Sequence, residues 1–437
     1  MKRKLGILSM LLALILLVGL FPAAGALAEE KTVRMWTFLN PEATDNGRSV
    51  ALKQMIDTYE AENPGVKIVV EPQDYNVMSA KFLAAHATGD APDIIWCTVD
   101  MLGSIRDAGA LEPFENLFLK DWTEEMVQDI SDVQWNFGVK DGKHYQVVLS
   151  KNIMTLYYRA DLFEKYGIAV PQTWDELVAA AQKLTGTDEE TGMPRYGLGM
   201  SFSTESSDAP LMFNQIVAAQ GSLFNENGSA NWANEAGAKA LQWQLDCITK
   251  YQITPMEAVN STTEDLFLEF YAGKYAMIIG GAVRVPNVKA AATFDPDGVQ
   301  IMLVPGDGTN PYSPCNLAGW CVGVWSGSKV KEEAGKFVET MISPESDYLW
   351  VTVGGQAPIR KSTVANNADF FADPANQYLS VMSTGFSQAG WMVPDNATTS
   401  GWTYDLNRAM QNVLVDGMTV EDALQATAEE YNARNGY

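Results

Sequence analysis

Strand-like and helix-like segments alternate near the N-terminus, and this order leaves few architectures open to the chain. Strands are indicated by the apolar and β-branched residues of 33–38, 66–70 and 93–97. Between them, apolar residues recur at positions i, i+3, i+4 and i+7 in 52–59, and a shorter helix is expected over 81–87. Because parallel strands need crossover connections, the alternation predicts an α/β fold with a mostly parallel sheet flanked by helices.

The same alternation continues through the rest of the chain. A capping box is expected at Thr173, whose hydroxyl accepts an early helix N–H while Glu176 reaches back. The length of 437 residues predicts two or three domains, and the absence of a Pro- or Ser-rich linker predicts a chain that crosses between lobes more than once. Further strands are expected at 147–149, 154–158 and 275–279, and helices around 173–184, 241–248, 330–341 and 419–431. Another helical stretch is expected after Trp402 and Tyr404, through Met410.

The composition argues against several functions. Lys and Arg total 30 against 54 Asp and Glu, a net charge of −24, whereas binding of nucleic acid rests on clusters of Lys and Arg. Two His residues leave little for a His-based metal site, and we expect no metal, no other cofactor and no catalytic residues. The 47% apolar content excludes disorder, because such a chain can bury a large core.

The N-terminus has the pattern of a secretory signal peptide. Three basic residues at 2–4 precede the almost wholly apolar run 5–20, and Ala26-Leu27-Ala28 forms a small-residue cleavage site. We expect removal of residues 1–28 on export, with cleavage after Ala26 as a competing site and a retained membrane anchor as the alternative. No Cys lies in or just after the run, so the mature protein is expected in the periplasm or outside the cell without a lipid anchor.

The four cysteines leave two interpretations open. In an oxidising compartment Cys97, Cys247, Cys315 and Cys321 allow three full disulfide pairings, and the sequence does not choose among them. They fit small, buried apolar residues equally well.

Several short segments, taken in their order and spacing, resemble a known family. The most specific are LYYRADLF at 156–163 and PQTWDEL at 171–177; YEAENPGVKI at 59–68, GDAPDII at 89–95 and FYAGKYAM at 270–277 support them. Together they resemble the extracellular solute-binding proteins of ABC importers, in the maltose-binding-protein-like class.

The resemblance implies two α/β lobes joined by a hinge, each assembled from separate chain segments. Lobe 1 is expected from 29–149 and 306–343, and lobe 2 from 150–305 and 344–437. A monomer would hold its ligand in the cleft between the lobes and present the closed form to the transmembrane permease subunits of the importer. Twelve Trp and 16 Tyr favour a carbohydrate, because flat aromatic faces suit the apolar C–H faces of sugars.

Candidate ligand-binding residues follow from strand ends and from the resemblance. Trp96 and Asp100 come after the third expected strand, and the related proteins carry a ligand-contacting Asp at the position of Asp100. Trp36 and Asn40 stand at the end of the first strand. Core packing is the alternative for both tryptophans, a turn for Asn40 and a helix N-cap for Asp100.

Further candidates lie in the expected second lobe. Asn152 occupies the position of a ligand-contacting Glu in the related proteins, with a strand-edge amide as its alternative. Arg284 follows a Gly-Gly-Ala segment and suits an acidic sugar, with a solvated surface residue as its alternative. Trp391, Trp402 and Tyr404 are aromatic candidates near the C-terminus.

Three other functions remain open from the sequence. A secreted glycosidase would need two facing carboxylates, which 54 acidic residues can supply, although no G-x-S-x-G or HExxH motif is present and His86 and His144 stand alone. A protein of the same fold could bind a non-sugar solute, or act as an adhesin or sensor.

Overall fold

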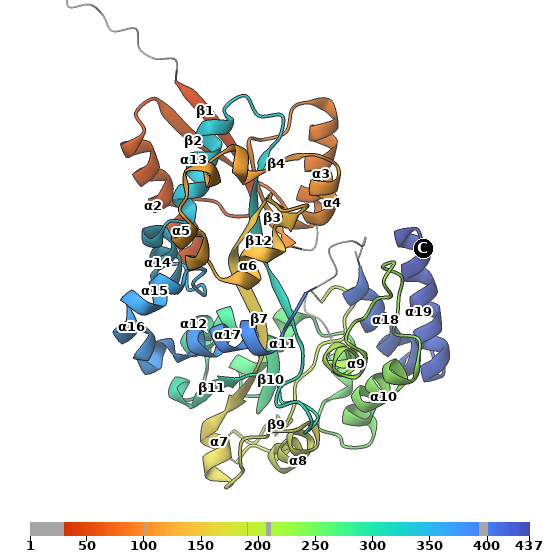
Figure 1. The fold of residues 1–437 in the computed structure, drawn as a ribbon. Helices are drawn as coiled ribbons and strands as arrows, with labels where there is room; N and C mark the ends of the chain where they lie inside the picture. Colours follow the sequence, from red (N-terminus) through yellow and green to blue (C-terminus); the bar gives the residue numbers. More distant parts are fainter. Residues whose placement is uncertain (1–29, 100–101, 190, 207–210, 393–400) are drawn as a thin grey trace, which may run out of the picture.

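The computed structural model describes residues 30–99, 102–189, 191–206, 211–392 and 401–437 as two lobes, one above the other in Figure 1. The expected signal peptide and the candidate Asp100 therefore lie outside the described residues. Within the described ranges, no helix combines the length and apolar content that a membrane crossing needs.

The sheet of lobe 1 is parallel at one side only. β1 (Lys31–Thr37) pairs in parallel with β2 (Val66–Pro72) and with β3 (Ile94–Thr98), as the alternation predicts. β12 (Cys315–Trp325) then pairs antiparallel with β3, and β7 (Val147–Arg159) antiparallel with β12. The α/β fold is confirmed, but the sheet is mixed rather than mostly parallel.

Two long strands connect the lobes. β7 and β12 run from lobe 1 into lobe 2, where β10 (Met277–Gly281) and β11 (Val299–Met302) pair antiparallel with β7. The sheet is thus continuous in the order β10-β7-β12-β3-β1-β2. The sequence predicted two short strands at 147–149 and 154–158, whereas the structure has one 13-residue strand.

Helices cover the sheet in both lobes (Figure 1). The apolar face predicted for 52–59 is the buried face of α2. Lobe 1 carries α2 (Gly47–Glu62), α3 (Tyr75–Thr88), α4 (Leu102–Asp107), α5 (Glu124–Asp129), α6 (Asp132–Phe137) and α13 (Lys331–Met341). Lobe 2 carries α7 (Ala160–Lys165), α8 (Trp174–Leu184), α9 (Met212–Gln220), α10 (Glu235–Thr249), α11 (Thr263–Tyr271), α12 (Val285–Ala291), α17 (Gln377–Gln388), α18 (Trp402–Leu414) and α19 (Val420–Asn435).

Each face of the lobe-1 sheet has its own apolar core. Side chains alternate along a strand, so Ile94 and Trp96 of β3 enter the core beside α2 and α13, while Ile95 and Cys97 enter the core beside α3. Lobe 2 has one larger core. All four cysteines are buried and none is in a disulfide in the described structure, although Cys97 and Cys321 are directly opposed across β3 and β12.

The capping box at the start of α8 differs in one detail from the prediction. The Thr173 hydroxyl accepts from the Glu176 N–H at 3.2 Å, as expected. The Glu176 carboxylate, however, accepts from the Gln172 N–H at 2.7 Å, one residue before the cap. The reciprocal bond therefore fixes the chain that enters the helix.

The expected lobe boundaries do not coincide with the packing. Gly306 accepts from the Trp174 N–H at 3.1 Å, and Cys315 belongs to the lobe-2 core, so the segment from 306 starts in lobe 2. In α14 (Pro344–Thr352), Trp350 packs in the lobe-1 core while Val351 packs in the lobe-2 core. This helix lies at the junction, and α15 (Lys361–Asn366) and α16 (Ala368–Ala372) lead from it to α17.

Candidate functional site

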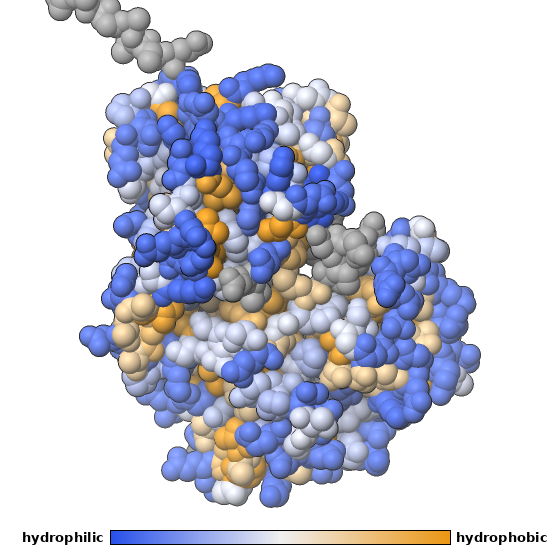
Figure 2. Space-filling model, in the orientation of Figure 1, coloured by the Kyte–Doolittle hydropathy of each residue, from blue (hydrophilic) through white to orange (hydrophobic). Residues whose placement is uncertain are grey.

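Figure 2 shows the face of the molecule on which the two lobes meet. β1 ends in this region, and β7 and β12 cross it. Side chains from both lobes that stand near these crossing points are therefore the first candidates for contact with a ligand.

The lobe-1 side of the junction carries an aromatic pair with a cation on it. The rings of Phe38 and Trp320 are 3.7 Å apart between centroids and tilted by 30°. The Arg48 guanidinium lies 5.0 Å from the centroid of the Phe38 ring. All three side chains are half-buried. We call Phe38, Arg48 and Trp320 the lobe-1 surface.

The start of α2 holds Arg48 in place. The Asn46 side chain accepts from the N–H groups of Arg48 and Ser49 as the helix N-cap. Gly47 packs so tightly that a Cβ there would lie 2.2 Å from the Val353 carbonyl oxygen. The backbone on either side of Arg48 is thus fixed by the Asn46 cap and by the segment 353–360, between α14 and α15, which we call the junction segment.

The lobe-2 side of the junction is formed by β7 and by the turn after β10. The Asn152 side-chain oxygen accepts from the Val283 N–H at 3.4 Å, and a Cβ on Gly281 would lie 2.2 Å from the Asn152 amide nitrogen. Arg284 pairs through both guanidinium NH2 groups with Glu264, one of them at 2.8 Å, and its guanidinium lies 4.6 Å from the Phe267 ring centroid. We call Asn152, Val283 and Arg284 the lobe-2 surface.

The two surfaces are electrostatically coupled. Burial, together with the positive charge of Arg284, lowers the pKa of Arg48. The Arg284 side chain, in turn, lowers the pKa of Glu264 through its hydrogen bonds. Arg48 and Arg284 come from opposite lobes, so the gap between the lobes is bordered by cations on both sides.

Lys151 lies behind this gap, on the opposite face of β7 from Asn152. Its side chain is buried, its amino group donates to the Pro358 carbonyl at 2.7 Å, and it lies 4.7 Å from the Phe386 ring centroid. Burial lowers the pKa of Lys151 to about 7, and the nearby charge of Asp347 opposes this shift. Lys151 therefore ties the crossing strand to the junction segment.

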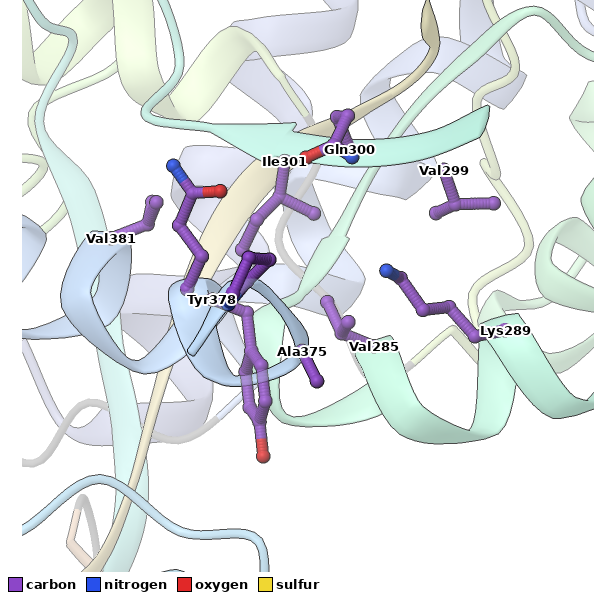
Figure 3. A pocket seen from close by; sticks show the side chains of 10 residues that line it. Val285, Lys289, Val299, Gln300, Ile301, Ala375, Tyr378 and Val381 are labelled. Atoms are coloured by element: carbon purple, nitrogen blue, oxygen red, sulfur yellow. The ribbon is translucent and has the colours of Figure 1, made fainter. Parts of the chain in front are cut away.

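A separate small cavity lies in lobe 2, among α12, β11 and α17 (Figure 3). Its volume is about 20 Å³, and Lys289, Ile301 and Tyr378 are among its lining residues. That volume holds about one water molecule, far less than a ligand pocket. Across the described ranges, no three His, Cys, Asp or Glu side chains group closely enough to hold a metal ion.

Comparison with known proteins identifies the family. The sequence profile of the bacterial extracellular solute-binding proteins matches residues 54–378. This chain belongs to the bacterial extracellular solute-binding proteins. The maltodextrin-binding protein MdxE of Bacillus subtilis is 25% identical over 336 residues, which cover 73% of this chain and 75% of the relative.

Solved structures of other binding proteins share the fold. The GacH receptor of Streptomyces glaucescens, solved unliganded and in complex with acarbose, matches with a TM-score of 0.75 and 22% identity over 93% of this chain and 99% of that one. UgpB of Mycobacterium tuberculosis, in complex with glycerophosphocholine, matches with a TM-score of 0.75 and 18% identity over 92% and 98%. The two-lobed binding-protein fold expected from the sequence is therefore confirmed.

The structure places the lobe-1 candidates of this solute-binding protein away from one another. Trp96 is fully buried in the core, edge-on to Trp350 at 5.2 Å, so its assignment to the ligand surface is corrected to core packing. Asn40 is exposed and accepts from the Glu42 N–H at 3.1 Å, which is the turn role. Trp36 is half-buried, and its indole N–H donates to Glu71 at 2.7 Å.

The C-terminal aromatic candidates of the binding protein form part of one cluster in lobe 2. Trp391 and Trp402 both pack against Phe213, with ring centroids 5.0 and 5.4 Å from it. Trp402 is 5% exposed and Trp391 is half-buried, whereas Tyr404 is 43% exposed. A stacking role is thus open to Trp391 and Tyr404, while Trp402 contributes mainly to the core.

Sequence reasoning missed the lobe-1 surface. The expected strand 33–38 ends at Phe38, and no sequence pattern singles out Arg48 or Trp320 as a ligand-binding residue. The available signal was the N-cap at Asn46, which places the next side chains at the start of a helix that follows a strand end. The contact between Phe38 and Trp320 joins residues far apart in sequence, so no local pattern could reveal it.

Proposed function

We propose that this protein is an exported substrate-binding protein that captures a carbohydrate between its lobes and delivers it to the permease subunits of an ABC importer. The observation that carries the proposal is the half-buried pair of Phe38 and Trp320 at the junction, with Arg48 beside it. Related proteins support it: the Bacillus subtilis relative is named for maltodextrin, and the GacH receptor was solved with acarbose.

The chemistry of the junction suits a sugar. The exposed part of an aromatic ring offers an apolar face to the C–H groups of a pyranose ring. Asn152 and Arg284 on the lobe-2 surface offer polar groups for the hydroxyl rim. A ligand that contacts both surfaces gains contacts only when the lobes approach, and it therefore shifts the population towards the closed form.

A hydrolase is the weaker alternative. A glycosidase needs a carboxylic acid that holds its proton near neutral pH. Two of the described carboxylates near the junction tend the other way, because hydrogen bonds from Arg34 and Trp36 lower the pKa of Glu71, and those from Arg284 lower the pKa of Glu264. We therefore propose that the bound sugar leaves unchanged.

The remaining parts of the proposal follow from the sequence and the family. Residues 1–28 are proposed to direct export and to be removed, and the protein would act as a monomer. The excess of acidic residues, which grows when the three basic residues at 2–4 are removed, is proposed to keep the exported protein soluble.

A thermal-shift screen against mono- and oligosaccharides tests the proposal. A sugar present at about 1,000 times its Kd adds about 4 kcal/mol to the free energy of unfolding. We expect stabilisation by at least one saccharide, no turnover of it in a chromatographic assay, and loss of the shift in Trp320→Ala. The matched control is Tyr166→Ala, an exposed aromatic beyond the end of α7. Product formation, or stabilisation by a non-sugar solute alone, would contradict the proposal.

A further inference from the structure

Two arginines face the junction from opposite lobes, and only one of them has an acidic partner in the described chain. Arg48 stands on the lobe-1 surface and Arg284 on the lobe-2 surface. We infer that the ligand carries an anionic group, a carboxylate or a phosphate, which Arg48 binds together with Arg284 when the lobes close. This inference rests on the proposed function and narrows its substrate class to acidic carbohydrates.

Arg48 lacks a carboxylate in the part of the chain that the structure describes. Its guanidinium contacts the Phe38 ring, and no described Asp or Glu lies within ion-pair distance. The other half-buried arginines near the lobe-1 strands do have such partners, as Arg34 has Glu71 at 2.8 Å. A half-buried cation loses part of its favourable hydration free energy, and the attraction of a paired anion compensates for this loss.

Arg284 already pairs with an acidic side chain, because Glu264 accepts from both NH2 groups of its guanidinium. Arg48, Arg284 and Glu264 together carry one net positive charge. The Glu264 side chain is 69% exposed, so water screens its pairing with Arg284 and a ligand anion can share the guanidinium with it.

The positive charges of Arg48 and Arg284 affect the free energy of lobe closure. Bringing Arg48 and Arg284 closer around a neutral sugar increases the repulsion between them in a place with little water. An anionic group between them converts the repulsion into two attractions, and the planar guanidinium binds a carboxylate or phosphate through paired hydrogen bonds. The site therefore favours closure on an anion over closure on a neutral solute.

The aromatic neighbours indicate what the rest of the ligand is. The Arg48 guanidinium lies over the ring of Phe38, which also contacts Trp320. If the anionic group of a ligand binds Arg48, the ring that carries this group lies against an apolar surface. A sugar ring with a carboxylate or phosphate substituent has both features. Uronic acids and sugar phosphates share this chemistry, and the experiment separates them.

Calorimetric titration with charge-matched probe pairs tests the inference. The carboxylate arm compares digalacturonate with galactobiose, and the phosphate arm compares glucose 6-phosphate with glucose, each at 20 and 200 mM NaCl. We expect the anionic member of one arm to bind at least tenfold more tightly than its neutral partner, and its affinity to fall with salt.

Variants assign the effect to Arg48. Arg48→Gln is expected to lose at least tenfold in affinity for the anionic probe, and the ratio of its anionic to its neutral affinity should fall at least tenfold relative to the parent protein. Arg48→Lys keeps the positive charge but not the planar guanidinium, and it is expected to lose less affinity for the anionic probe than Arg48→Gln does. The control is Lys53→Gln on the same helix, an exposed residue paired with Asp57, which should change neither affinity.

The outcomes separate this inference from the proposed function. Equal or tighter binding of the neutral probes, or an unchanged anionic affinity in Arg48→Gln, overturns the inference and leaves the sugar-binding proposal standing. Failure of every saccharide, neutral and acidic, to bind overturns both. Melting of each unliganded variant within a few degrees of the parent protein confirms that the comparison concerns folded protein.

Discussion

Asp405 is a buried acid with an incomplete set of partners. Its side chain in α18 is fully buried and pairs with Arg434 of α19, but its second carboxylate oxygen has no hydrogen-bond partner in the described structure. Burial raises the pKa of Asp405 to about 6, and the pairing with Arg434 only partly offsets this shift. The folded protein therefore favours the protonated acid more than the unfolded chain does.

This raised pKa predicts a pH-dependent stability. Asp405 contributes stability that is fully present below about pH 4 and is lost as the pH rises through about 6, with an upper limit of about 3 kcal/mol. The parent protein should lose free energy of unfolding between pH 4.5 and 7 relative to Asp405→Asn, as measured by urea denaturation. Parallel curves for the two proteins would show that Asp405 is not the titrating group.

The four cysteines give a second prediction at this scale. Burial raises the pKa of Cys315 to about 12 and also raises that of Cys247, so these thiols should not react in the folded protein. A thiol-specific reagent should find no reactive thiol before unfolding and four after it. A count of two after unfolding would contradict the free thiols and point to a Cys97–Cys321 disulfide, because these residues are opposed across two strands.

At the scale of elements, the hydrophobic patterns predicted what depends on local spacing. The apolar face of α2 and the starts of α8 and α19 could be predicted, because a cap and a helical period each lie within a few residues. The start of α2 at Gly47 was not predicted. The continuity of β7 and the direction of β12 could not, since both depend on partners far away in the chain. The prediction that Trp96 contacts the ligand was wrong for a related reason. The position of a residue at the end of a strand indicates that it reaches the edge of the sheet, but it does not indicate the face of the sheet to which the side chain points.

β7 also carries the lysine that joins the crossing strand to the junction segment. Because the folded pKa of Lys151 is lowered to about 7, its contribution to stability is present at high pH and is lost as the pH falls through about 7. The free energy of unfolding of the parent protein should rise from pH 7 to 9 relative to Lys151→Met. Exposed Lys53→Met serves as the control and should follow the parent protein. If the free energy of unfolding of Lys151→Met also follows that of the parent protein between pH 7 and 9, Lys151 is not the titrating group.

One large sheet passes through both lobes of the molecule. Closure of the lobes must therefore bend the crossing strands β7 and β12 or shift the segment after α14. The positions of the two surfaces follow from this arrangement. Phe38, Arg48 and Trp320 reach the junction from three segments of lobe 1, and Asn152 and Arg284 from two segments of lobe 2. The sequence supplied the family and the two lobes, but the pairing of Arg48 with Arg284 across them required the folded chain.

That pairing predicts how a charge reversal should change the shape of the unliganded protein. Arg48→Glu replaces repulsion between the lobes with attraction to Arg284, and the closed form should become more populated. Small-angle X-ray scattering at 20 mM NaCl is expected to give a smaller radius of gyration for Arg48→Glu than for the parent protein. The difference should shrink at 500 mM NaCl, where charges are screened over a few ångströms. Lys53→Glu makes the same change of charge on the outer part of α2 and should leave the radius unchanged; equal radii for the two variants at low salt would show that Arg48 and Arg284 do not act on each other across the junction.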